Sequence, residues 1–132
     1  MDTVSKTKND GKEKYFLGWT DIERCIYRIV DWYRFNKIEA KNIYGIPRGG
    51  LIPAVMLSHK LNLPLIFDEE QIDKETIVID DIEDGGMTMG FIHLGYKVVL
   101  YSKLEKDSSC DYYSEPIGKH KWVVFSWEVP NE

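Results

Sequence analysis

Apolar and polar positions follow a helical period first and then a series of short strand-like runs. The helical segment begins at Thr20-Asp21-Ile22-Glu23, which matches a capping box, and is predicted to end near Phe35. Its apolar positions recur every three or four residues, as expected for one buried helix face: Ile22, Ile26, Ile29, Val30 and Tyr33. An amphipathic helix over this segment would cover one face of a sheet.

Short apolar runs separated by further helical segments predict the rest of the fold. Strands are expected at 42–46, 63–67, 76–80, 97–102 and 122–125, with helices at about 51–61 and 88–94. Residues 103–121 are expected to form an ordered loop or a short extra strand. This alternation predicts an α/β fold, with a parallel or mostly parallel β-sheet and helices on both faces.

A chain of 132 residues fits one domain. Residues 1–14 are polar and lack apolar periodicity, so they are predicted to be a flexible N-terminal tail, with the domain at 15–132. No apolar run is long enough for a membrane span or a signal peptide, which favours a soluble, cytoplasmic protein without a membrane partner. Cys25 and Cys110 form no C-x-x-C pair and are expected to be reduced.

The net charge of the chain favours some classes of ligand over others. Seventeen basic and twenty-two acidic residues give a net charge of −5, which disfavours a nucleic-acid surface and leaves small anions as better candidates.

Two glycine turns follow predicted strands. In the first, residues 76–79 lead into Asp80, Asp81, Asp84 and then Gly85-Gly86; in the second, Gly45-Ile46-Pro47-Arg48-Gly49-Gly50 joins a strand to a helix. Such turns can aim backbone N–H groups at phosphate oxygens, and both fall where open α/β sheets bind ligands. The glycine spacing of the second turn also fits a Walker loop, but Leu51-Ile52 replaces the required Lys and Ser/Thr, which argues against an NTPase.

Three segments resemble motifs of type I phosphoribosyltransferases. Residues 77–88 are similar to the family signature, residues 46–50 to its pyrophosphate loop, and residues 122–128 to the base-binding segment of the bacterial xanthine-guanine branch. The resemblance implies a purine phosphoribosyltransferase of purine salvage. Such an enzyme transfers the 5-phosphoribosyl group of phosphoribosyl pyrophosphate to a 6-oxopurine (xanthine, guanine or hypoxanthine), with Mg²⁺, and is usually a dimer or tetramer.

The resemblance also implies a role for each matching residue. Asp84 would accept the proton from the base, and Asp81 would also hold the metal. The remaining roles are the ribose for Asp80 and Asp81, the 5′-phosphate for Gly85, Gly86, Met87 and Thr88, the pyrophosphate for Arg48, Gly49 and Gly50, and the base for Lys103, Trp122 and Val123.

Two departures from the family keep a second hypothesis open. Gly85 stands where the family usually has Thr, and the flexible loop that closes such sites is replaced by residues 68–75, a short link with five acids and one lysine. The enzyme is favoured by Asp84 and Trp122, and a non-catalytic nucleotide-binding or sensor protein of the same fold by the short link. Plainer interpretations are a core position for Trp122 or Trp127, a surface position for Lys103 and a solvated Glu83.

Overall fold

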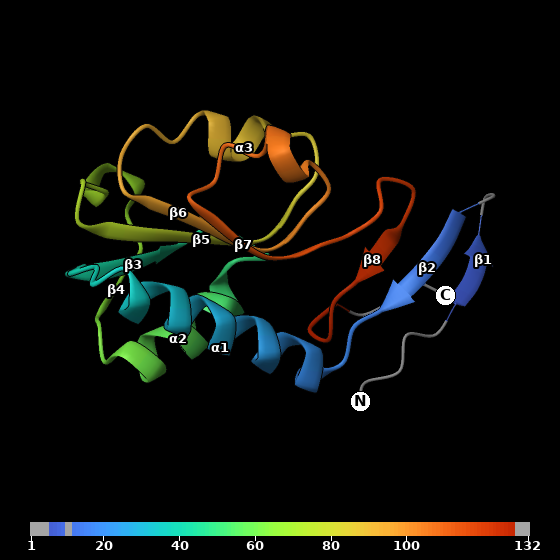
Figure 1. Ribbon diagram of the computed structural model, residues 1–132, viewed down its shortest axis with the longest axis horizontal. Helices are drawn as coiled ribbons and strands as arrows, with labels where there is room; N and C mark the ends of the chain where they lie inside the picture. Colours follow the sequence, from blue (N-terminus) through green and yellow to red (C-terminus); the bar gives the residue numbers. More distant parts are fainter. Residues whose placement is uncertain (1–5, 10–11, 129–132) are drawn as a thin grey trace.

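The computed structural model describes residues 6–9 and 12–128, and its centre is a five-stranded sheet (Figure 1). The strand order is β4-β3-β5-β6-β7, and every neighbouring pair is parallel. This confirms the predicted parallel α/β fold. The strands are β3 (Asn42–Gly45), β4 (Leu65–Ile66), β5 (Thr76–Glu83), β6 (Tyr96–Ser102) and β7 (Tyr112–Pro116).

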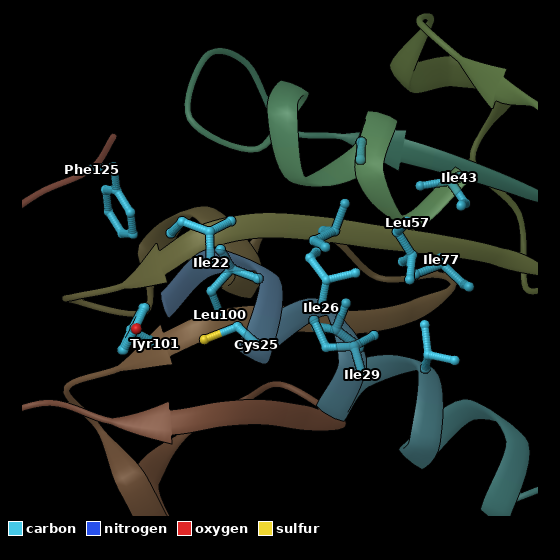
Figure 2. Close-up of a cluster of buried hydrophobic side chains, with 14 of the residues drawn as sticks. Ile22, Cys25, Ile26, Ile29, Ile43, Leu57, Ile77, Leu100, Tyr101 and Phe125 are labelled. Carbon is cyan, nitrogen blue, oxygen red and sulfur yellow. The ribbon is translucent and has the colours of Figure 1, made fainter. Parts of the chain in front are cut away.

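Helices cover both faces of this sheet, as predicted (Figure 1). On one face, α1 (Trp19–Phe35) packs on β6 and β7, and α2 (Leu51–Leu61) packs on β3 and β5. In Figure 2, the α1 side chains Ile22, Ile26 and Ile29 point toward Ile77 and Leu100 of the sheet, and all five are fully buried. The helical periodicity therefore predicted the buried face of α1 correctly.

The start of α1 differs from the predicted capping box. Gly18 is the N-cap, and its N–H donates to Asp21 Oδ2 at 3.0 Å. Asp21 is buried and also pairs with the Arg24 guanidinium at 3.0 Å, while Arg24 pairs with Glu115 of β7 at 2.9 Å. The helix begins at Trp19, one residue before the predicted start, and of these contacts only the pair with Glu115 depends on the tertiary fold.

A second apolar cluster holds the opposite face. Met89 of α3 (Met87–Gly90) packs with Tyr44, Val78 and Val99 of the sheet. The helix is shorter than the predicted 88–94 segment: it forms a single turn and ends before Phe91. Ile72, from the acidic link, packs against the same cluster, so the link is folded back onto the sheet.

The environment of Glu83 differs from the solvated position that the sequence suggested. It is 3% exposed, at the end of a β5 that is longer than predicted, and accepts hydrogen bonds from Ser102 Oγ (2.9 Å), Ser108 Oγ (2.5 Å) and Ser109 N (3.2 Å). A buried carboxylate needs such partners. Glu83 therefore anchors the segment between β6 and β7, which contains a short 3₁₀ helix at Glu105–Asp107, instead of lying in solvent.

A small second sheet contains part of the predicted tail. Its order is β1-β2-β8, from β1 (Lys6–Asn9), β2 (Lys12–Phe16) and β8 (Trp122–Val124), with β1 antiparallel and β8 parallel to β2 (Figure 1). The predicted boundary after residue 14 thus falls inside β2. The polar pattern of this segment gave no sign of the pairing with β8, which lies about a hundred residues away, and the antiparallel pairing of β1 with β2 was not predicted either. Residues 1–5 and 10–11 lie outside the described part of the chain.

Across residues 6–9 and 12–128, no helix combines the length and the apolar character that crossing a membrane requires.

Candidate active site

Three adjoining pockets lie along the ends of β5, β6 and β8 and along the turns at 47–50 and 85–88. We name them after one residue each: the Trp122 pocket (about 390 Å³), the Arg48 pocket (about 680 Å³) and the Gly86 pocket (about 400 Å³). Asp81 and Glu128 line both the Trp122 and the Arg48 pockets, and Ile82 and Asp84 line both the Trp122 and the Gly86 pockets. The three hollows are therefore continuous around the end of β5.

Nearly all of the residues predicted to form the site line these pockets. The Trp122 pocket contains Asp81, Asp84, Lys103, Trp122 and Val123; the Arg48 pocket contains Arg48, Gly49 and Asp81; the Gly86 pocket contains Asp80, Asp84, Gly85, Gly86, Met87 and Thr88. Residues distant in sequence are thus brought to one place by the parallel strands, which all point their carboxyl ends to the same edge.

Asp80 and Asp81 stand at the centre because β5 is the middle strand of the sheet. Asp81 N–H donates to Asp80 Oδ1 at 2.8 Å, and Ile82 N–H donates to Asp81 Oδ1 at 2.7 Å. Burial raises the pKa of both carboxyls, and the neighbouring Asp81 charge raises that of Asp80 further. Among the ion pairs of the described residues, none includes either carboxylate. The pair is therefore available to hydroxyl donors or a cation.

The turn at 47–50 lies directly against this pair. A Cβ atom at Gly49 would overlap the Asp81 carboxylate, so only glycine allows the two to approach this closely. Arg48, next to it, is exposed and faces the Arg48 pocket.

Gly50 has a packing role that the sequence did not predict. A Cβ there would collide with the backbone of Ile79 and Ile46, and its N–H donates to Ile46 O at 2.8 Å. That N–H is already paired within the turn. Of the three residues predicted to bind the pyrophosphate, Arg48 and Gly49 line the Arg48 pocket and Gly50 does not.

The turn at 85–88 uses its two glycines differently. Gly86 has a φ of 76°, in the left-handed region that favours glycine, and a Cβ there would lie 3.1 Å from Leu104 Cδ1. A Cβ at Gly85 would meet no atom within 4 Å. Gly86 is thus needed for the shape of the turn, whereas Gly85 has room for a side chain.

Lys103 and Asp84 form a charged pair at the mouth of the Trp122 pocket. Their Nζ and Oδ2 atoms are 3.4 Å apart, and the Lys103 side chain is 11% exposed against 72% for Asp84. The Lys103 N–H also donates to Glu83 O, which fixes its backbone beside β5. Lys103 is therefore not the free surface lysine of the plainer interpretation.

The C-terminal segment supplies the opposite wall. Trp122 is 41% exposed on β8 and lines the pocket, whereas Trp127 is half-buried, stacks on Phe125 at 5.0 Å and faces the Arg48 pocket. Five further residues of this pocket were not predicted from the sequence: Lys119, His120, Lys121, Phe125 and Glu128. The first three precede the segment 122–128 that resembles the family, and the last two lie within it but had no assigned role. Basic residues clustered beside Trp122 were the available signal.

The acidic link contributes to none of these three pockets. Asp68 caps the 3₁₀ helix Glu69–Gln71, and Asp73 pairs with Lys41 at 2.5 Å, which ties the link to the start of β3. The five acids of the link therefore line none of the three pockets, and the link provides no cover for them.

Comparison with solved structures shows which class of proteins shares this fold. The fold matches a purine phosphoribosyltransferase from Pyrococcus horikoshii (TM-score 0.69, 28% identity, 90% of this chain and 97% of the other) and a hypothetical protein from Neisseria gonorrhoeae with bound ppGpp (TM-score 0.71, 20% identity, 89% and 90%). The chain thus has the fold of the type I phosphoribosyltransferases.

Sequence comparison finds relatives among the bacterial xanthine-guanine phosphoribosyltransferases. The xanthine-guanine phosphoribosyltransferase of Idiomarina loihiensis is 22% identical over 142 residues, covering 88% of each chain, and that of Desulfotalea psychrophila is 22% identical over 92% of this chain and 90% of the relative. No family model matches the chain. In sequence, the chain resembles bacterial xanthine-guanine phosphoribosyltransferases, and its fold is that of purine phosphoribosyltransferases.

Proposed function

We propose that the protein is a purine phosphoribosyltransferase that transfers the 5-phosphoribosyl group of phosphoribosyl pyrophosphate to a 6-oxopurine. The observation that carries this proposal is the meeting of three pockets at Asp81 and Asp84. The Trp122 pocket would take the base, the Arg48 pocket the pyrophosphate and the Gly86 pocket the 5′-phosphate. The ribose would then lie over Asp80 and Asp81, where the pockets join.

The reaction needs charge stabilisation more than covalent catalysis. As the bond between the anomeric carbon and the pyrophosphate oxygen breaks, the ribose gains positive and the leaving group negative charge. Asp80 and Asp81 face the ribose, while the Arg48 guanidinium and the Gly49 N–H would face the pyrophosphate, so preorganised charges of the correct sign lie at each end. The base bonds to the anomeric carbon and its proton passes to Asp84.

Lys103 would serve the base side of the same step. Its ammonium group lies 3.4 Å from Asp84 Oδ2, so a 6-oxo group bound beside Asp84 would also be within reach of Lys103. The cation would balance the negative charge that forms on the purine oxygen as the proton passes to Asp84.

The donor set fits magnesium. Mg²⁺ prefers oxygen ligands and is often held by one or two carboxylates together with substrate phosphates. Asp81, with Asp80 beside it, offers such oxygens, and the described residues contain no group of three or more metal-binding side chains that would hold an ion without substrate. Bound with the donor, Mg²⁺ would neutralise charge on the pyrophosphate.

A direct assay tests the proposal. The protein is incubated with Mg²⁺, phosphoribosyl pyrophosphate and one of xanthine, guanine, hypoxanthine or adenine, and nucleotide product is measured. Asp84→Asn is the matched variant: we expect a rate about 10²–10⁴-fold lower with donor affinity nearly unchanged. Absence of product with all four bases, from protein that binds the donor, would reject turnover.

A second candidate is a nucleotide-binding protein without turnover. It is supported by the short link, which leaves the three pockets uncovered, and by the structural similarity to the Neisseria gonorrhoeae protein with bound ppGpp. Calorimetry separates the two candidates, since a sensor would bind a nucleotide but form no product from base and donor.

A further inference from the structure

β2 and β8 hold each other through two reciprocal contacts between lysines and aromatic rings. Lys14 Nζ of β2 lies 4.6 Å from the centre of the Trp122 ring, and Lys121 Nζ, just before β8, lies 4.0 Å from the centre of the Tyr15 ring. Lys121 Nζ also donates to Tyr15 Oη. Each strand thus places a cation on an aromatic side chain of the other, at a distance where the attraction is significant.

The strand that carries Trp122 depends on this pairing. β8 has three residues and lies at the edge of its sheet, so among the described strands only β2 pairs with it, with Lys14 opposite Trp122 and Phe16 opposite Val124. The pairing continues beyond the strands, because Leu17 N–H donates to Val124 O at 2.9 Å and Ser126 Oγ donates to Leu17 O at 2.6 Å. A three-residue strand without this partner would not hold its place.

The contact also constrains a ring that is partly exposed. Trp122 is 41% exposed, and Lys14 contacts the ring without being part of the lining of the Trp122 pocket. A cation held over the ring limits its rotamers and leaves the pocket side of the ring available for stacking.

We propose that Lys14 is a positioning residue that orients Trp122 for the purine, with the Lys121–Tyr15 contact holding the two strands together, so that strand β2 is part of the base-recognition apparatus. The inference rests on the proposed function for the identity of the ligand. Lys14 lines none of the three pockets. Its effect should therefore reach the base and nucleotide through Trp122 and leave the binding of phosphoribosyl pyrophosphate unchanged.

The test uses the full chain with three variants. Lys14→Met removes the cation and keeps the aliphatic stem, Lys14→Arg keeps the cation, and Lys60→Met is the matched control, since Lys60 lies 4.5 Å over the Tyr27 ring on the outer side of α1 and α2. Calorimetry measures the affinity for GMP and for phosphoribosyl pyrophosphate with Mg²⁺. The indole N–H resonance of Trp122, assigned with Trp122→Phe, is followed by NMR without ligand.

We expect Lys14→Met to weaken GMP binding about three- to fivefold, to raise the KM for the base with kcat nearly unchanged, and to shift the Trp122 resonance. Donor affinity should stay within twofold, Lys14→Arg should restore GMP binding, and Lys60→Met should change none of these quantities. Lys121→Met should also weaken GMP binding, but because Lys121 lines the Trp122 pocket, Lys14→Met is the variant that tests positioning alone.

The possible failures can be told apart. Unchanged GMP affinity or an unmoved Trp122 resonance in Lys14→Met would overturn this inference, while product formation by the wild type would still support the proposed function. Equal losses of GMP and donor affinity would also overturn it, because they indicate general loosening of the fold. A shifted resonance in a protein whose wild type binds no purine nucleotide would support the contact but refute the proposed function.

Discussion

Replacing Asp80 by Asn should stabilise the fold while it damages the site. The two carboxyls of Asp80 and Asp81 are adjacent and half-buried, and burial raises the pKa of each. The hydrogen bond from Asp81 N–H to Asp80 Oδ1, 2.8 Å long, can be retained because an Asn side-chain carbonyl also accepts it. The substitution therefore removes mainly the charge.

The sign of the effect with pH follows from the direction of the pKa change. Below pH of about 4, Asp80 is protonated in both the folded and the unfolded chain, and wild type and variant should have similar stability. As the pH rises, the unfolded chain ionises first, which favours unfolding of the wild type alone, and the difference grows until the pH passes the raised pKa of the folded protein. Asp80→Asn should therefore gain stability over the wild type between acidic and mildly alkaline pH.

A difference of one unit in pKa corresponds to about 1.4 kcal/mol, so we expect a gain of about 1–3 kcal/mol at pH 8, or a Tm higher by about 3–10 °C. Urea unfolding at pH 4 and pH 8 measures it, and Asp84→Asn is the control, since its exposed pair with Lys103 should contribute less than about 1 kcal/mol. Donor affinity should fall more than tenfold in Asp80→Asn and further in the double variant with Asp81→Asn. A variant less stable than the wild type at pH 8, or a difference independent of pH, would refute the reasoning.

Three further substitutions test other parts of the structure. Glu83→Gln should cost about 2–3 kcal/mol in urea unfolding, because the bonds from Ser102, Ser108 and Ser109 are to a buried carboxylate, whereas exposed Glu75→Gln should cost little; equal effects would contradict the anchoring role. Gly85→Thr should tighten donor binding about tenfold, since the site has room for a side chain and the hydroxyl can bond to the phosphate, and calorimetry showing weaker binding would mean that the turn does not hold the 5′-phosphate. Trp122→Ala should weaken GMP binding by about 1–2 kcal/mol with donor affinity retained, and parallel losses for both ligands would mean that the exposed ring supports the site as a whole and not the base in particular.

Local patterns in the sequence determined four strands of the main sheet, the two helices on one of its faces and the segments of the site, but not β7 or the second sheet to which β8 belongs. The apolar period of α1, the strand at 76–79 and the helix 51–61 follow from local preferences that tertiary contacts reinforce, so they were predictable. The glycine turns could be placed because backbone conformation restricts residue type there.

The tertiary structure alone decided which distant groups meet. Nothing near Glu83 in sequence indicates that three serine groups from positions 102–109 would surround it, and nothing in residues 1–14 indicates that β2 pairs with β8. Likewise, Gly49 touches Asp81, and Glu128 joins two pockets, only because parallel strands bring their carboxyl ends to one edge. Contacts of this kind depend on the packing of the whole chain, and a local pattern carries no information about a partner a hundred residues away.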